Sequence, residues 1–124
     1  MAHQRLAQVP LRLIDSITEL AADDQGCFAI SGSHGGLSSA RYAAAVKPLL
    51  SVFNDAGVGK ASAGVAGLAT MQEIGLAACT VSHASACIGQ ASSTYESGVI
   101  SFANSAALAL GVVVGMRVRA LLEE

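Results

Sequence analysis

Short apolar runs alternate with polar, glycine-rich segments along most of this chain. Three of these runs, at residues 27–31, 49–53 and 76–81, have the length of buried strands. Each run ends in a loop of Gly, Ser, Asn, Asp or His residues. The pattern therefore predicts three strands of a sheet that is buried on both faces, as parallel sheets are.

Segments with helical spacing separate these predicted strands. Leu13, Ile14, Ile17 and Leu20 recur at i, i+3 and i+4 positions, which predicts a helix over residues 11–22. The other predicted helices cover residues 38–46, 61–73, 93–110 and 116–124, and a fourth, very short strand is predicted at residues 112–114. The helix over 93–110 is expected to start at a capping box formed by Ser93 and Glu96.

Alternating strands and helices are typical of an α/β fold with right-handed crossovers. We expect a small three-layer, Rossmann-like or flavodoxin-like domain with a mainly parallel sheet of about four strands. Residues 1–124 are interpreted as one domain, with residues 1–25 as an N-terminal helical segment packed on it. Gly64 and Gly67 lie in a predicted helix, where Ala would be more stable by about 1 kcal/mol. They predict a close backbone contact, either with the sheet or with a second copy.

The loops at residues 31–36, 54–60 and 82–89 hold most of the side chains that can perform chemistry. In open α/β sheets, ligands bind outside the carboxyl ends of the strands. We therefore expect the functional site at that edge. The order of the strands, which the sequence does not reveal, decides whether the three loops meet.

Two familiar cofactor motifs are excluded by the spacing in these loops. The glycines of the first loop follow G-x-x-G-G and not the dinucleotide fingerprint G-x-G-x-x-G. Gly59-Lys60 resembles part of a phosphate-binding P-loop, but Asn54 and Ala61 stand where that motif needs Gly and Ser or Thr. No cofactor is expected, and no metal site either, because the His, Cys and Asp residues lack a recognised ligand spacing.

The leading hypothesis for the site combines a base, a carboxylate and a nucleophile. His34 is the expected general base, Asp55 orients it or binds substrate, and Ser85 or Cys87 is the candidate nucleophile. The backbone N–H groups of residues 32–36 are expected to hold a carboxylate or an oxyanion. The expected substrate-binding residues are Ser33, Gly35, Gly36, Asn54, Lys60, His83 and Glu96.

Simpler structural roles remain open for several of these residues. The glycines of residues 32–36 can form a tight turn, and Asp55 can cap an Asx turn. Cys87 can be a buried, inert thiol, and Glu96 can serve only as the capping partner of Ser93.

These residues favour an enzyme of hydrolase, lyase or isomerase type, acting without a cofactor on a small polar metabolite that carries a carboxylate or an amide. The alternative is a non-catalytic ligand-binding module or a homo-oligomeric assembly module. No single motif is specific enough to decide between these classes.

Charged residues make up 13% of the chain, against roughly 25% in average soluble proteins. Between residues 61 and 116 the only formal charges are Glu73 and Glu96, which predicts a homo-oligomer that buries this half. The seven basic residues are scattered and the net charge is −2, so no nucleic-acid partner is expected.

A membrane location is not expected. The uncharged stretch at residues 97–116 is interrupted by Ser, Asn and Gly residues. Arg5, Arg12 and Asp15 lie in the segment that would be apolar in a secretory signal, so no such signal is expected at the N-terminus. The three cysteines form no CxxC pair, which favours the reducing cytoplasm.

Overall fold

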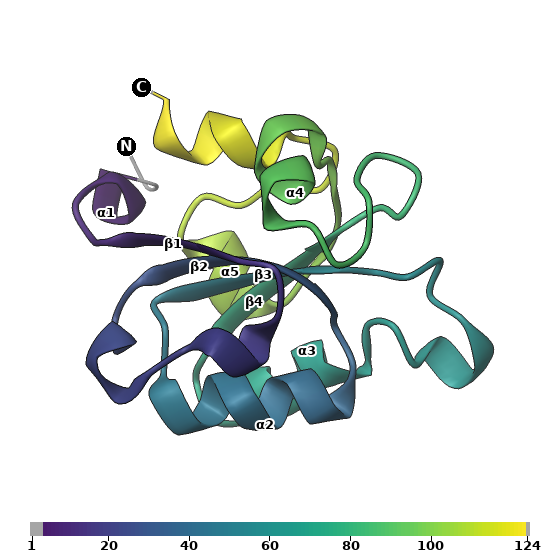
Figure 1. Cartoon of the computed structure of the whole chain (residues 1–124), viewed down its shortest axis with the longest axis horizontal. Helices are drawn as coiled ribbons and strands as arrows, with labels where there is room; N and C mark the ends of the chain where they lie inside the picture. Colours follow the sequence, from purple (N-terminus) through teal and green to yellow (C-terminus); the bar gives the residue numbers. More distant parts are fainter. Residues whose placement is uncertain (1–3, 124) are drawn as a thin grey trace.

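A computed structural model describes residues 4–123 and shows a five-stranded sheet with helices on both faces (Figure 1). The strands are β1 (Leu11–Ile14), β2 (Phe28–His34), β3 (Leu50–Asn54), β4 (Ala77–Val81) and β5 (Ile100–Ala103). They lie in the sequential order β1-β2-β3-β4-β5. Strands β1 to β4 are parallel, and β5 pairs antiparallel with β4.

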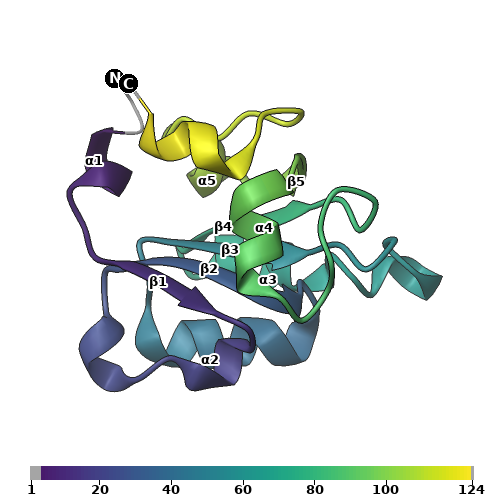
Figure 2. The same cartoon turned by 45° about the horizontal axis from the view of Figure 1, so that its top comes forward.

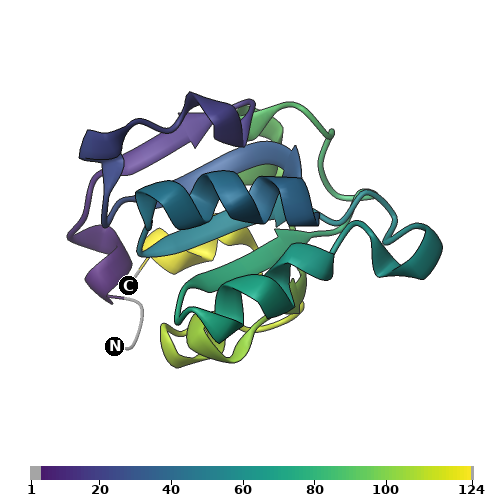
Figure 3. The same ribbon diagram turned by 90° about the horizontal axis from the view of Figure 1, so that it is seen from below.

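The helices divide between the two faces of the sheet. One face, the α2 face, carries α2 (Leu37–Val46), α3 (Ala66–Glu73) and the 3-10 turns η1 (Ile17–Glu19) and η2 (Ala22–Asp24) (Figure 3). The other face, the α4 face, carries α1 (Gln4–Ala7), α4 (Ala91–Ser97), α5 (Ser105–Ala109) and η4 (Val118–Leu122). Helix α1 and η4, from opposite ends of the chain, lie side by side (Figure 2). A further 3-10 turn, η3 (Lys60–Ser62), precedes α3.

Each face of the sheet has its own hydrophobic core, because successive side chains of a strand point to opposite faces. Leu50 and Val52 of β3 belong to the core of the α4 face, whereas Phe53 belongs to the core of the α2 face. Burial on both sides explains why β2, β3 and β4 have apolar sequences without alternation.

The prediction of a helix at residues 11–22 is wrong. Residues 11–14 form the edge strand β1, and the turns η1 and η2 follow it. Leu11 and Leu13 are about 40% exposed at this edge, while Ile14 and Ile17 are buried against α2. A half-exposed edge strand followed by short turns imitates helical spacing over so few residues. Residues 1–3 of the expected N-terminal segment lie outside the described residues.

The continuous helix expected over 93–110 is also wrong, because Gly98 ends α4 and the chain returns as β5. The capping box is absent: Ser93 lies inside α4, and its Oγ accepts a hydrogen bond from the Cys87 N–H. A capping box forms instead at Ser16 and Glu19.

No strand forms at residues 112–114. Val112 is buried, whereas Val113 and Val114 are exposed in a turn. The expected last helix is the shorter 3-10 turn η4, and Glu124 lies outside the described residues.

The α/β class and the mainly parallel sheet are confirmed, but the sheet has five strands, not four. Its sequential order differs from the Rossmann order 3-2-1-4-5-6 and from the flavodoxin order 2-1-3-4-5. Gly64 and Gly67 do make close backbone contacts, but with the turn after β2 and the segment after β3 and not with the face of the sheet, and Gly64 lies before α3. A Cβ on Gly67 would collide with the carbonyl oxygen of Gly36, and one on Gly64 with that of Asp55. Across residues 4–123, no helix has the length and apolar character needed to span a membrane.

Candidate functional site

The three glycine-rich loops follow neighbouring parallel strands and lie side by side at one edge of the sheet. His34 at the end of β2 is in register with Asn54 of β3, and Asn54 is in register with Val81 of β4. The Gly35 N–H donates to the Asn54 carbonyl, and the Asp55 N–H donates to the Val81 carbonyl. The strand ends are therefore tied together by backbone hydrogen bonds.

The chain leaves β3 and β4 in opposite directions, which opens a crevice between them. The segment after β3 leads to α3 on the α2 face, whereas the segment after β4 leads to α4 on the α4 face (Figure 1). This divergence of adjacent connections is the topological switch point at which open α/β sheets bind ligands.

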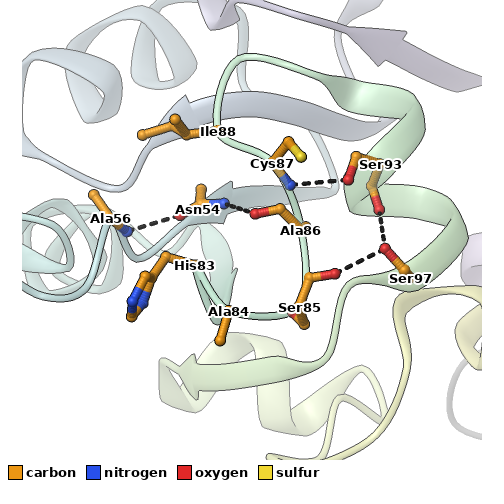
Figure 4. A pocket seen from close by; sticks show the side chains of 10 residues that line it. All are labelled: Asn54, Ala56, His83, Ala84, Ser85, Ala86, Cys87, Ile88, Ser93 and Ser97. Atoms are coloured by element: carbon orange, nitrogen blue, oxygen red, sulfur yellow. Dashed lines mark hydrogen bonds between the residues drawn. The ribbon is translucent and has the colours of Figure 1, made fainter.

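A pocket with a volume of about 500 Å³ lies beside this crevice (Figure 4). It is lined by Asn54, Ala56, His83, Ala84, Ser85, Ala86, Cys87, Ile88, Ser93 and Ser97. The fully buried Asn54 joins its walls: Nδ2 donates to the Ala86 carbonyl, and Oδ1 accepts from the Ala56 N–H. We call this cavity the switch-point pocket.

Asp55 and His83 form a carboxylate–imidazole pair next to the switch-point pocket. Asp55 Oδ1 lies 3.5 Å from His83 Nδ1 and accepts hydrogen bonds from the backbone N–H groups of His83 (3.0 Å) and Gly57 (2.8 Å). The Asp55 side chain is 6% exposed, whereas the His83 side chain is 63% exposed. The carboxylate is thus fixed by the backbone, and the imidazole remains open to solvent.

Asp55 is held in its ionised form. Burial alone raises the pKa of a carboxyl group and is the largest single influence here. Hydrogen bonds from the Gly57 N–H, the Ser101 hydroxyl and the His83 N–H, together with the nearby imidazole, outweigh it and lower the pKa of Asp55 below its ordinary value. A buried carboxylate next to an exposed imidazole favours the tautomer that carries the proton on Nδ1.

The hydroxyl groups in the switch-point pocket are engaged in local structure. Ser85 Oγ donates to the Ser82 carbonyl and accepts from the Val99 N–H. Ser97 Oγ donates to the Ser85 carbonyl. These contacts hold the loop after β4 against α4 and give Ser85 no partner that would activate it as a nucleophile.

Cys87 is a free, exposed thiol in the switch-point pocket, so the buried state considered for it is wrong. Its side chain and that of His83 point in different directions in Figure 4. Cys27 and Cys79 are buried, and burial raises their pKa values to about 11 and about 12. These two thiols are inert at neutral pH.

His34 does not meet Asp55. It lines a second cavity of about 380 Å³ beside the ends of β1 and β2, where its Nδ1 lies 3.4 Å from Ser39 Oγ. Ile88 lines both cavities, and the Gly89 N–H donates to the Gly32 carbonyl. The segment around Ile88 therefore crosses the end of β2 and separates the two histidines.

The glycine-rich turn after β2 is used for packing. Gly35 and Gly36 are buried against the segment that leads into α3, and a Cβ on Gly35 would lie 2.8 Å from the Gly64 carbonyl oxygen. The Gly35 N–H is already bound to Asn54, and Ser33 Oγ accepts from the Ile17 N–H. These contacts occupy groups that the sequence suggested for an anion.

The two charged candidates lie apart from the switch-point pocket. Glu96 is exposed on α4, and its Oε2 lies 3.4 Å from the Arg119 guanidinium. Lys60 is exposed in η3. Neither residue lines the switch-point pocket in this structure.

The sequence carries no sign of Ser101 on the antiparallel strand β5, because that segment is expected to be helical; its hydroxyl bonds to Thr80 and helps to lower the pKa of Asp55. Sequence reasoning also missed Ile88, Ser93 and Ser97, whose positions depend on the path of the chain from β4 to α4. Among residues 4–123, no three His, Cys, Asp or Glu side chains gather as a metal site.

Comparison with known protein families, with curated proteins and with solved structures finds no match for this chain.

Proposed function

We propose that this protein is a small-molecule enzyme of hydrolase, lyase or isomerase type. It acts at the switch-point pocket on a small polar metabolite that carries a carboxylate or an amide. The proposal rests on one observation, the pair of Asp55 and His83 at the topological switch point next to that pocket. A histidine oriented by a buried carboxylate is a common arrangement for proton transfer.

In the proposed mechanism, His83 is the general base. The Asp55 carboxylate lies 3.5 Å from Nδ1 and favours a proton there, so the lone pair of Nε2 is available for a proton. Nε2 removes that proton from a water molecule in a hydrolysis, or from a carbon next to a carbonyl group in an elimination or isomerisation. Asp55 then stabilises the imidazolium. In a hydrolysis the water oxygen bonds to the carbonyl carbon and the bond to the leaving group breaks, and in an elimination the leaving group departs from the neighbouring carbon; in both, the imidazolium gives its proton to the leaving group. In an isomerisation the imidazolium gives the proton to the neighbouring carbon.

His34 was the expected base, and it remains a candidate for a second role at the same edge. Its cavity adjoins the switch-point pocket at Ile88, so a longer substrate can contact both histidines. Cys87 is the candidate nucleophile that is free in the pocket, whereas Ser85 is engaged in local hydrogen bonds.

A ligand screen followed by a turnover assay tests this function. Small carboxylates and amides are screened by thermal shift, and hits are incubated in D₂O and followed by NMR for turnover or hydrogen exchange. Replacing His83 by Ala should reduce the rate by about 10²-fold or more, as expected for the loss of a general base. Arg41→Ala is the control, because it removes an exposed side chain of α2 that does not line the switch-point pocket. Unchanged turnover in His83→Ala would exclude the mechanism.

A homo-oligomeric assembly module is the second candidate. It is favoured by exposed apolar side chains in the charge-poor half: Leu108, Val113 and Val114 are 51%, 60% and 56% exposed in α5 and the turn that follows. Exposed apolar patches often mark protein interfaces. Light scattering tests this second candidate, since a monomer at micromolar concentration would contradict assembly as the main function.

We also propose a cytoplasmic location and a homo-oligomeric state for the enzyme. Three unpaired cysteines, one of them exposed, suit a reducing compartment.

A further inference from the structure

The loop between β3 and α3 projects from the body of the protein next to the switch-point pocket. It covers residues 56–63 and is the teal segment that extends to the right in Figure 1 and in Figure 3. The loop is closed at its base by hydrogen bonds from the Val58 N–H to the Asp55 carbonyl and from the Gly64 N–H to the Val58 carbonyl, each 2.7 Å long. Most of its residues between these points are exposed.

The backbone of this loop is strained. Ala56, Val58 and Ser62 have φ values of 52°, 69° and 59°, in the left-handed region that favours glycine. Val58 is the most unusual of the three, because a β-branched residue rarely adopts a positive φ. Strained residues of this kind concentrate at active sites, ligand clamps and switch regions.

The loop is connected directly to the candidate site. It begins after Asp55, and Ala56 lines the switch-point pocket. Gly57 lies against the imidazole, since a Cβ at this position would be 3.5 Å from Cε1 and Nδ1 of His83. A movement of the loop about Gly57 and Gly59 would therefore change the opening of the pocket.

Lys60 gives this loop a positively charged side chain. It is the only Lys or Arg between Lys47 and Arg117 in the sequence. The structure gives it no ion-pair partner within residues 4–123. Its Cα is at most about 11 Å from that of Gly57, because three Cα–Cα steps of about 3.8 Å join the two residues along the chain. Neither Lys nor Arg lines the switch-point pocket itself, and Asp55 next to it repels anions.

We propose that residues 56–63 form a lid and that Lys60 is its ligand-binding residue. Closure of the lid places the Lys60 ammonium against the carboxylate of a ligand in the switch-point pocket and compensates the charge of Asp55. The substrate class is then a small carboxylate and not the neutral amide. This inference rests on the proposed function, because it uses the same pocket.

The first test compares matched ligands. Acetate, lactate, malonate and succinate are titrated alongside their amides, and the backbone NMR signals of Gly57, Gly59 and His83 are followed. At least one carboxylate should bind about tenfold more tightly than its amide, as expected for a charge-assisted hydrogen bond. Lys60→Gln should remove this preference, and Lys60→Arg should retain most of it. Lys47→Gln is the control, since it removes an exposed lysine at the other edge of the sheet.

The second test reports the position of the lid without any turnover. Trypsin should cleave the Lys60–Ala61 bond of the free protein, and the carboxylate that binds should slow this cut by about tenfold or more. The Lys60→Arg variant should be cleaved and protected in the same way. The Lys60→Gln variant should lose this cleavage, which shows that trypsin cuts after residue 60.

The outcomes separate the lid from the proposed function. Carboxylate binding that depends on His83 but not on Lys60 overturns the lid and leaves the proposed function intact. Equal binding of carboxylates and amides, or unchanged cleavage on binding, also overturns the lid. Binding that depends on Lys60 without any turnover supports the lid and contradicts the enzyme.

Discussion

Asp55 and His83 come from the ends of two neighbouring strands. The Asp55 carboxylate accepts a hydrogen bond from the His83 backbone N–H and lies 3.5 Å from the ring Nδ1 of His83. One side chain therefore fixes the start of the loop after β4 and orients its imidazole. The pairing requires that β3 and β4 be adjacent and parallel, which is the case.

Replacement of Asp55 by Asn should make the protein less stable at neutral pH by about 1–3 kcal/mol, because hydrogen bonds to a charged group are lost. The pKa of Asp55 is lower in the folded protein than the ordinary value of 3.8. Its stabilisation is therefore complete above about pH 4 and is lost as the pH falls through the folded pKa. Urea unfolding from pH 7 to pH 3 should show the two proteins converging. A difference that stays constant with pH would contradict the ionised state of Asp55.

Ser51→Ala should leave stability unchanged or raise it by about 1 kcal/mol, because the buried Ser51 hydroxyl has no hydrogen-bond partner in the described part of the chain. Ser31→Ala on the adjacent strand β2 is the matched control. Ser31 Oγ donates to the Val52 carbonyl at 2.8 Å, so its loss should cost about 1 kcal/mol. Equal effects of the two variants in urea unfolding would count against the unpaired state of Ser51.

Val58→Gly should raise the free energy of unfolding by about 1 kcal/mol, because glycine adopts the φ of 69° without steric cost. Val65 is also half-buried at the end of the same loop, but its φ is −128°. Val65→Gly should therefore lower stability by about 1 kcal/mol. Thermal unfolding of both variants measures the difference, and the same sign for both would argue against strain at Val58.

Gly67→Ala should destabilise the protein by about 1–3 kcal/mol, even though alanine favours a helix. The added methyl group would meet the backbone of Gly35 and Gly36, which cannot turn away as a side chain can. Thr70→Ala, at an exposed position of the same helix, should have little effect. A more stable Gly67→Ala protein would disprove the close contact between α3 and the turn after β2.

The elements that the sequence predicts best are the buried ones. Strands β2, β3 and β4 are buried on both faces, so their existence is predictable. The predicted ends of β3 and β4 lie within one residue of the observed ends, whereas β2 continues to His34, three residues past its predicted end at Ser31. The edge strands β1 and β5 bury one side only and pair with one neighbour. Their few apolar residues fit a helix as well as a strand, and the sequence analysis predicted helices there.

The candidate site shows the same division. Asp55, His83, Cys87 and Asn54 were all predicted from their positions after buried strands, and the structure brings them to one crevice. The partner of Asp55 was not predictable, because His34 and His83 follow strands on either side of β3. The segment at Gly89 and Gln90 packs against Gly32 and places His34 in a separate cavity, and this contact joins segments far apart in the chain.

The sequence by itself determined the α/β class, the three central strands and the edge at which polar groups gather, because burial and turn formation are local properties of short segments. Only the tertiary structure decided the strand order, the divergence of the chain after β3 and β4, and the pairing of Asp55 with His83. These features depend on the face of the sheet that each connection crosses and on contacts between distant segments. The pattern of polar and apolar residues along the chain determines neither of them.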